Sequence, residues 1–270
     1  MDKDDATPAF LLKNISYHYP GGEVGLLDIS LDIHDTERVV LLGANGSGKS
    51  TLLKVLDGLV FPQNGTIEAF GTPLNEKNLN NDGLNHTFRQ RVGFVFQNAD
   101  AQLFSSTVYE EIAFGPLHMN LDASQIRQRV GDILDLFDLN HIKDRPPFKL
   151  SGGEKRKVAL ASVLAINPDV LMLDEPTTGL DQRTQRWLID MLVRLGGAGK
   201  TILTATHDLE IVEEIADVVL VFSEDHRLAA SGKPHEILSD KDLLLRVNLI
   251  DPRFHQHVHG GDHRHYHSHA

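Results

Sequence analysis

The sequence predicts an α/β fold with a mainly parallel core sheet and a small antiparallel β subdomain at its N-terminal end. From residue 38 onward, short apolar and β-branched runs alternate with helix-like stretches, a pattern typical of parallel strands buried on both faces. Before residue 72, closely spaced segments alternate apolar and polar residues, which favours antiparallel pairing. A chain of 270 residues is long enough to bury a sizeable hydrophobic core.

The individual elements follow from these patterns. The predicted core strands are 38–42, 92–96, 170–174, 201–205 and 218–222, and the predicted antiparallel strands are 11–17, 26–33 and 65–70. Residues 72–90 are rich in Asn and weakly patterned, and they predict a loop or a short irregular helix. Apolar residues at three- and four-residue spacing predict a helix at 124–139 that packs on the core, with partner binding as the alternative: Ile126, Val130, Ile133, Leu134 and Phe137.

The composition excludes several classes of protein. With 38 acidic and 26 basic side chains the formal net charge is −12, which argues against a nucleic-acid partner. The absence of Cys excludes thiol chemistry. The longest apolar runs, such as 218–222, are far shorter than the roughly 18 residues needed to cross a bilayer, and the acidic N-terminus lacks the features of a signal peptide. We therefore expect a cytoplasmic protein without a membrane span.

A phosphate loop is predicted at residues 43–50, GANGSGKS, between the strand 38–42 and a helical pattern. The glycines allow backbone N–H groups to surround phosphate oxygens. In this motif Lys49 reaches the β- and γ-phosphates, and the hydroxyl of Ser50 holds Mg²⁺. The loop therefore predicts a site for a nucleoside triphosphate.

A second candidate is the segment VLMLDEP, 170–176, a buried strand that ends in two acids. Asp174 can hold the same Mg²⁺ as Ser50, and Glu175 can polarise a water for attack on the γ-phosphate. Taken alone, the segment could equally be a strand that ends in a solvated turn. Together with a phosphate loop, it predicts hydrolysis of the terminal phosphate.

The segment KLSGGE, 149–154, predicts a helix with an unusual first turn. Ser151 and Glu154 have the spacing of a capping box, and a well-capped helix is the simplest interpretation. Gly152 and Gly153, however, each cost about 1 kcal/mol relative to Ala inside a helix. Their presence favours a site where phosphate approaches bare N–H groups at the positive end of the helix dipole.

These motifs together resemble, in order, those of the ATP-binding-cassette (ABC) ATPases from residue 8 to about 238. LSGGE, which begins 24 residues before Asp174, looks like the signature motif of the family. Tyr19 resembles the aromatic residue that stacks on adenine, with Tyr17 as a neighbouring alternative. Gln97 resembles the Q-loop glutamine, and His207 resembles the switch histidine.

The D-loop of the family is similar to Gly179, Leu180 and Asp181. Two departures from the common pattern are Glu154, where many members have Gln, and Ala44, where Pro is frequent. Neither side chain need touch the γ-phosphate. The resemblance therefore implies an active ATPase.

The resemblance implies a P-loop NTPase fold that binds ATP and Mg²⁺ and forms a dimer, in which two copies enclose two ATP molecules head to tail. The implied parts are an ATPase domain at 8–238 with a helical signature subdomain at about 98–167, a C-terminal helical extension at 239–253 and a His-rich flexible tail at 254–270. The implied catalytic residues are Glu175, His207, Gln97 and Lys49. The implied Mg²⁺ ligands are Ser50, Asp174 and Gln97. The implied nucleotide-binding residues are Tyr19, Gly43, Asn45, Gly46, Ser47, Gly48, Lys49, Ser50, Thr51, Ser151, Gly152, Gly153 and Asp181.

The stretch GFVFQNADAQLFSSTVYEEIAFGP, 93–116, resembles the corresponding region of the energy-coupling-factor group of ABC importers. The resemblance implies a transmembrane coupling component and a substrate-binding membrane component as partners. It places the chain peripherally on the cytoplasmic face of the cell membrane. The expected docking socket is apolar, with two acids nearby, although local packing is an alternative: Gln102, Leu103, Phe104 and Val108, with Glu110 and Glu111.

The tail holds seven of the fifteen His residues: His255, His257, His259, His263, His265, His267 and His269. Neutral imidazoles at two-residue spacing can ligate Ni²⁺, Co²⁺ or Zn²⁺, and an engineered purification tail is the alternative. Together with the importer resemblance, the tail favours Co²⁺ as the cargo, with Ni²⁺ next. The alternatives are a vitamin importer of the same group and a soluble ATPase or metallochaperone. A homodimer is preferred over pairing with a second ATPase.

Overall fold

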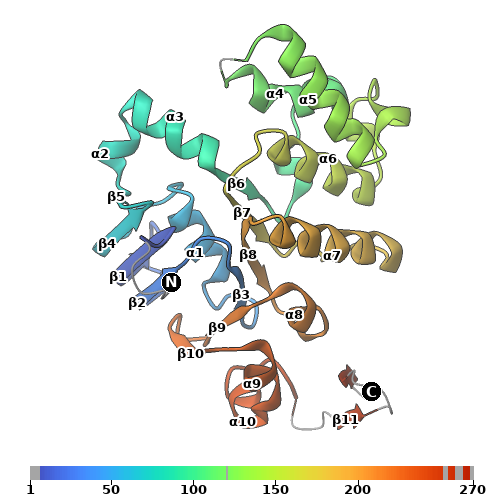
Figure 1. The fold of residues 1–270 in the computed structure, drawn as a ribbon. Helices are drawn as coiled ribbons and strands as arrows, with labels where there is room; N and C mark the ends of the chain where they lie inside the picture. Colours follow the sequence, from blue (N-terminus) through green and yellow to red (C-terminus); the bar gives the residue numbers. More distant parts are fainter. Residues whose placement is uncertain (1–6, 120, 252–254, 259–263, 268–270) are drawn as a thin grey trace.

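The structure, a computed structural model, describes residues 7–119, 121–251, 255–258 and 264–267 (Figure 1). It confirms the predicted fold, with one mainly parallel sheet and one antiparallel sheet. The larger sheet has the strand order β10 (Leu228–Gly232), β9 (Val218–Phe222), β3 (Arg38–Leu42), β8 (Thr201–Thr206), β7 (Val170–Asp174) and β6 (Val92–Val95). All its pairs are parallel except β10 with β9.

The smaller sheet is antiparallel throughout, as its alternating pattern predicts. Its order is β2 (Val24–Ile33), β1 (Phe10–His18), β4 (Asn64–Ala69) and β5 (Thr72–Pro73). The helix α1 (Lys49–Leu56) buries its apolar side chains in the core that these strands share with the larger sheet. The phosphate loop thus lies where the two sheets meet.

The prediction of a loop or short irregular helix at 72–90 is largely wrong. This stretch forms β5, a short helix α2 (Glu76–Leu79) and the ten-residue helix α3 (Asp82–Arg91). Two of the five Asn residues in this stretch are helix N-caps, because the side chain of Asn75 accepts from the N–H of Asn78 and that of Asn81 from Leu84.

Helices gather on one side of the sheet between residues 99 and 164 (Figure 1). They are η2 (Ala99–Ala101), α4 (Val108–Leu117), α5 (Ala123–Leu136), η3 (Asn140–Ile142), η4 (Pro147–Lys149) and α6 (Gly152–Leu164). In α5, Val130 and Leu134 are buried, and Phe137 follows them into the same core. The predicted core-facing helix is therefore confirmed, and α7 (Gln182–Gly197) buries apolar side chains in the same core.

The C-terminal part of the described chain packs on the larger sheet. The helices α8 (Leu209–Ile215), α9 (Pro234–Ser239) and α10 (Lys241–Arg246) share a hydrophobic core with β9. The expected domain boundary at residue 238 falls inside α9. Within the described residues, no helix combines the length and apolar character that a bilayer crossing requires.

The tail contributes two short strands, β11 (His255–Val258) and β12 (Arg264–His267), which pair antiparallel with His255 opposite His267 and His257 opposite His265. Of the expected metal ligands, His259, His263 and His269 lie outside the described residues. No cluster of three or more His, Asp or Glu able to hold a metal occurs in the part of the chain whose side chains are described.

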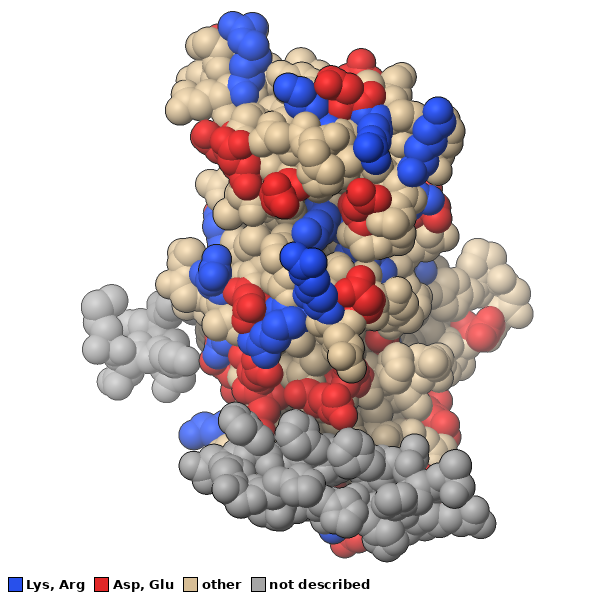
Figure 2. Space-filling model, turned by 90° about the vertical axis from the view of Figure 1, so that its right-hand side faces the viewer, with Lys and Arg blue, Asp and Glu red and all other residues tan. Residues whose placement is uncertain are grey.

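The face drawn in Figure 2 carries basic and acidic side chains in alternation. The expectation that nucleic acid is not a partner, drawn from a net charge of −12, stays a prediction.

Asp57, directly after α1, is a buried carboxyl that makes folding depend on pH. It is 5% exposed and forms an ion pair with Arg89 at 3.0 Å. Burial raises the pKa of Asp57 from the ordinary value of 3.8 to about 6, against the opposing effect of Arg89. Because the pKa is higher in the folded chain, this carboxyl favours folding below pH 4, and that contribution is lost as the pH rises to 6.

We expect Asp57→Asn to remove this pH dependence. Relative to the variant, the wild-type free energy of unfolding should fall by about 2 kcal/mol between pH 4 and pH 7, since one pKa unit corresponds to about 1.4 kcal/mol and the unfolded carboxyl is already partly ionised at pH 4. Urea unfolding at both pH values measures this, with the exposed Asp82→Asn as a control. A wild-type-to-variant difference that is the same at both pH values would contradict it.

Candidate functional site

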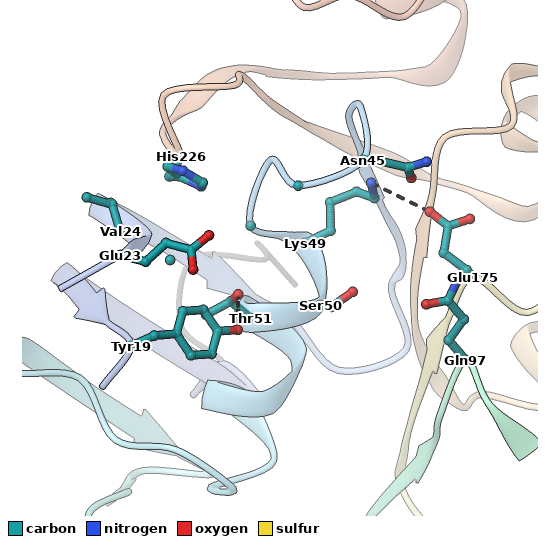
Figure 3. Close-up of a pocket in the computed structure, with 13 residues that line it drawn as sticks. Tyr19, Glu23, Val24, Asn45, Lys49, Ser50, Thr51, Gln97, Glu175 and His226 are labelled. Carbon is teal, nitrogen blue, oxygen red and sulfur yellow. Dashed lines mark hydrogen bonds and ion pairs between the residues drawn. The ribbon is translucent and has the colours of Figure 1, made fainter. Parts of the chain in front are cut away.

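A cavity of about 370 Å³ lies over the phosphate loop, between the antiparallel sheet and the carboxyl end of β7 (Figure 3). Most of the predicted nucleotide-binding and catalytic residues of one chain line it: Tyr19, Asn45, Gly46, Gly48, Lys49, Ser50, Thr51, Gln97 and Glu175. In Figure 3, Tyr19 lies at one end, and Gln97 and Glu175 lie at the other, with Lys49 between them. Along the cavity, an aromatic ring is thus followed by a cation and then by a carboxylate, the order in which a base, a triphosphate and an attacking water would lie.

The backbone of the phosphate loop requires glycine at specific positions. Gly46 and Gly48 have φ values of 86° and 106°, in the left-handed region. A Cβ on Gly48 would lie 2.6 Å from the carbonyl oxygen of Gly25, and one on Gly43 would lie 2.8 Å from that of Phe222. The loop therefore lies tight against β2 and β9, with its N–H groups at the start of α1.

Lys49 is a buried cation in the centre of the site, 4% exposed. Its ammonium donates to the carbonyl oxygens of Gly43 at 2.7 Å and Ala44 at 3.1 Å, and lies 3.5 Å from Oε1 of Glu175. Burial lowers the pKa of Lys49, and Glu175 partly offsets this effect. The side chain is thereby fixed within the loop, with its charge directed toward the carboxylate of Glu175.

Ser50 and Asp174 lie in direct contact, although they are 124 residues apart in the chain. The hydroxyl of Ser50 donates to Oδ1 of Asp174 at 2.7 Å. Burial raises the pKa of Asp174, and the hydrogen bond from Ser50 opposes the increase. A hydroxyl and a carboxylate in contact beside a phosphate loop are oxygen ligands suited to Mg²⁺.

Glu175 has the geometry of a functional residue under strain. Its φ is 43°, in the left-handed region that residues other than Gly rarely adopt, and the residue is 5% exposed. Oε2 accepts from Nδ1 of His207 at 3.0 Å, whereas Oε1 has no hydrogen-bond partner. Oε1 lies 3.5 Å from the ammonium of Lys49, and a buried carboxylate oxygen that makes no hydrogen bond can accept one from a water in the cavity.

Tyr19, and not Tyr17, lines the cavity. The hydroxyl of Tyr19 contacts the hydroxyl of Thr51 at 2.8 Å, which holds the ring beside α1. Tyr17 is 6% exposed and packs edge-on against Tyr19, with 5.0 Å between ring centroids. Tyr17 therefore supports the position of Tyr19, and only Tyr19 is placed to stack on a base.

His207 approaches Glu175 from the opposite side. It lies between β8 and α8 and lines a second cavity of about 420 Å³, which Glu175 also borders. Gln185 and Asp208 line the same cavity. His207 and Lys49 therefore contact the same carboxylate, and each of them lines a different cavity.

The signature residues Ser151, Gly152 and Gly153 and the D-loop residue Asp181 lie outside the first cavity. They lie at the N-termini of α6 and α7, which are close together, since a Cβ on Gly153 would lie 3.3 Å from the side chain of Thr184. The structure confirms the predicted capping box of Ser151 and Glu154. Two other loop residues, Gly43 and Ser47, are buried beneath the cavity and do not line it.

Four further residues line the cavity and were not predicted. Glu23, Val24 and Gly25 follow the turn after Tyr19, so their proximity to it in sequence could have indicated them. His226 comes from the turn before β10, and no motif indicates it. Its carbonyl oxygen accepts from the N–H of Leu27, which brings this distant turn to the cavity.

Comparison with known proteins agrees with this geometry. The family model described as ABC transporter matches residues 26–178, more than half of the chain. The chain belongs to the ABC transporter family. Its ABC fold and its cofactors, ATP and Mg²⁺, follow from this membership, and the contacts of Lys49, Ser50 and Asp174 fit both cofactors.

Individual relatives are similar over nearly the whole chain. The nickel import ATP-binding protein NikO of Rhodobacter capsulatus is 46% identical over 90% of this chain and 96% of its own length. The structure of cbiO1 from Clostridium perfringens, part of the transporter complex cbiONQ, superposes with a TM-score of 0.76 and 36% identity, covering 92% of this chain and 97% of that one. The dimeric cassette MJ0796 bound to ADP and Pi has a TM-score of 0.75 and 28% identity, covering 83% and 98%.

Proposed function

We propose that this chain is the ATP-hydrolysing subunit of an energy-coupling-factor-type importer for a transition-metal ion, either Co²⁺ or Ni²⁺. The observation that carries the proposal is the convergence of Lys49, Ser50 with Asp174, and Glu175 on one cavity. Relatives named for nickel import and for energy-coupling-factor transport support the class of importer. Nickel import is attested in those names, while Co²⁺ rests on the tail and the resemblance alone.

The site residues have distinct proposed roles in hydrolysis. Lys49 and the N–H groups of the phosphate loop bind the β- and γ-phosphates, and Tyr19 stacks on the adenine. Ser50, Asp174 and Gln97 would hold Mg²⁺, which neutralises phosphate charge. Glu175 orients a water and accepts its proton through Oε1, which makes no hydrogen bond in the free chain, while His207 fixes the other oxygen.

The proposed assembly is a dimer of two copies. The first turn of α6 does not line the cavity of its own chain. This position is required if its residues are to bind the nucleotide of the other copy. The dimeric cassette MJ0796 supports this arrangement. Each ATP would then be bound by the phosphate loop of one copy and by Ser151, Gly152 and Gly153 of the other.

The expected docking socket needs correction. Val108 is fully buried and Leu103 packs on the same core, while Glu111 is 3% exposed and accepts from the N–H groups of Phe104 and Ser105. Gln102 is also engaged internally, with the N–H of Phe96 and the carbonyl of Ala159. These four residues hold the chain locally and are not free for a partner.

The exposed apolar surface in this region consists of Phe104, Phe114 and Leu117, which are 67%, 45% and 60% exposed. The rings of Phe104 and Phe114 meet edge-on at 4.8 Å. We define these three residues as the aromatic patch. Its proposed occupant is an apolar segment of the transmembrane coupling component, which would hold the chain peripherally on the cytoplasmic face of the membrane.

Metal uptake into vesicles that contain the membrane components tests the proposal. With ATP supplied to this chain, we expect accumulation of ⁶³Ni²⁺ or ⁵⁷Co²⁺ and no accumulation of vitamins. Phe104→Glu in the aromatic patch should reduce uptake at least about tenfold and leave the ATPase activity of the isolated chain unchanged, because it places a charge in an apolar contact.

Two further outcomes of the uptake experiment would favour the alternative functions. Uptake of a vitamin alone would favour a vitamin importer, and ATPase activity with no uptake of any cargo would favour a soluble ATPase.

Deletion of residues 254–270 tests the tail, whose imidazoles we propose as Co²⁺ or Ni²⁺ ligands. Equal metal binding by the full and the shortened chain in equilibrium dialysis would contradict that role.

A further inference from the structure

Arg156, on the second turn of α6, is a buried cation with unusual partners. It is 6% exposed. One nitrogen of its guanidinium donates to the carbonyl oxygen of Phe96 at 2.7 Å, and the other donates to that of Gln97 at 2.6 Å. Among the residues that the structure describes, it forms no ion pair with a carboxylate. Burial lowers the pKa of Arg156, which reflects the cost of removing this charge from water.

A buried guanidinium without an ion-pair partner destabilises the fold, because removing its charge from water costs several kcal/mol. Stability alone therefore does not account for it. Its fork geometry is instead suited to fixing two acceptors relative to each other. Here the two acceptors are consecutive carbonyl groups, at the point where β6 ends and the chain turns into the cavity. The second of them belongs to Gln97, whose position near Glu175 is drawn in Figure 3.

Two other contacts connect the same segment to α6. Lys155 pairs with Asp100 at 2.5 Å. The side chain of Gln102 accepts from the N–H of Phe96 and donates to the carbonyl oxygen of Ala159. Lys155 is 18% exposed at its side chain and Asp100 is 66% exposed, so this pair is partly screened by solvent. The buried contact of Arg156 is therefore the stronger connection between α6 and the backbone of Gln97.

The first turn of α6, directly before the turn that carries Arg156, begins with the exposed signature residues Ser151 and Gly152. Because Arg156 donates to the carbonyl oxygens of Phe96 and Gln97, a displacement of this turn would act on the backbone of Gln97. In the proposed dimer, the signature residues contact ATP bound to the partner copy, whereas Gln97 serves the ATP of its own chain. Arg156 thus lies between the two nucleotide sites of the dimer.

We propose that Arg156 is a positioning residue that holds Gln97 at the γ-phosphate end of its own site and couples it to the site completed by the signature turn. This inference rests on the proposed function, because it requires the ATP-bound dimer. It concerns only how the two sites communicate, and not whether the chain hydrolyses ATP.

The test uses ATP hydrolysis by the full-length chain with Arg156→Lys, which keeps the positive charge but cannot span both carbonyl groups. We expect kcat to fall about tenfold, while the KM for ATP stays within about twofold, because the phosphate loop is untouched. We also expect the wild type to show a Hill coefficient above 1 for ATP, and the variant to show one close to 1.

A double-mutant cycle separates positioning from a structural role. If Arg156 acts through Gln97, adding Arg156→Lys to Gln97→Ala should change kcat less than about twofold. Lys157→Gln, one residue along the same helix, is the matched control and should leave the Hill coefficient unchanged.

A full further tenfold loss in the Gln97→Ala background would overturn the positioning role. A Hill coefficient of 1 in the wild type, or one that persists unchanged in Arg156→Lys, would overturn the coupling. In either case the wild-type rate of hydrolysis still reports on the proposed function, so the two failures are distinguishable.

Discussion

Replacing Glu175 with Gln is expected to lower the rate of ATP hydrolysis at least about 1,000-fold, while the chain still binds ATP and forms a dimer with it. Oε1 of Glu175 makes no hydrogen bond in the free chain and is the oxygen available to a water. An amide cannot accept the proton of that water. The strained φ of 43° places this carboxylate, and the shape of the backbone is compatible with Gln.

The same substitution should not weaken nucleotide binding. Removing a negative charge 3.5 Å from Lys49 frees this cation for the phosphates and removes repulsion of the γ-phosphate. Phosphate release measures turnover, and size-exclusion chromatography with ATP measures the dimer. The exposed Glu76→Gln on α2 serves as the control. Turnover above a tenth of the wild-type rate in Glu175→Gln would show that another group activates the water.

Sequence alone predicts those parts of the site whose chemistry is local. The phosphate loop is an example, because left-handed φ values at Gly46 and Gly48 and the contact of Gly48 with Gly25 restrict these positions to glycine. The order of strands and helices is likewise predicted, since burial on both faces imposes continuous apolar runs. The contact between Ser50 and Asp174 follows once both motifs lie at the carboxyl edge of one parallel sheet.

Prediction fails where the role of a residue depends on a hydrogen bond whose partner the sequence does not indicate. Glu111 looks like a surface acid, yet it is buried because its carboxylate satisfies the N–H groups of Phe104 and Ser105. Asn75 and Asn81 look like loop residues, yet they cap helices. His226 reaches the cavity only because its turn pairs with Leu27, about 200 residues earlier in the chain. Such contacts depend on the packing of distant elements.

Replacing Lys49 with Met should weaken ATP binding at least about 100-fold, or about 3 kcal/mol, because the buried cation that meets the phosphates is lost. It should also destabilise the free protein by about 3 kcal/mol, since Glu175 then keeps its buried charge without Lys49. A single variant cannot separate these two effects, because an unstable site also binds poorly.

Combining Lys49→Met with Glu175→Gln separates them. The double variant removes both charges of the pair, so its stability in urea should return to within about 1 kcal/mol of the wild type. Its affinity for ATP, measured by calorimetry, should remain about 100-fold weaker, because neither substitution restores a cation beside the phosphates. Lys77→Met, at an exposed position of α2, controls for the loss of one positive charge.

Recovery of ATP affinity in the double variant would mean that Lys49 acts mainly by compensating Glu175, and that the N–H groups of the phosphate loop bind the triphosphate without it. Persistence of the affinity loss in a stable double variant would instead assign the binding role to the ammonium itself. The buried pair would then have two separate roles. In the free chain, each charge compensates the other. With nucleotide bound, Lys49 would neutralise phosphate charge and Glu175 would activate the attacking water.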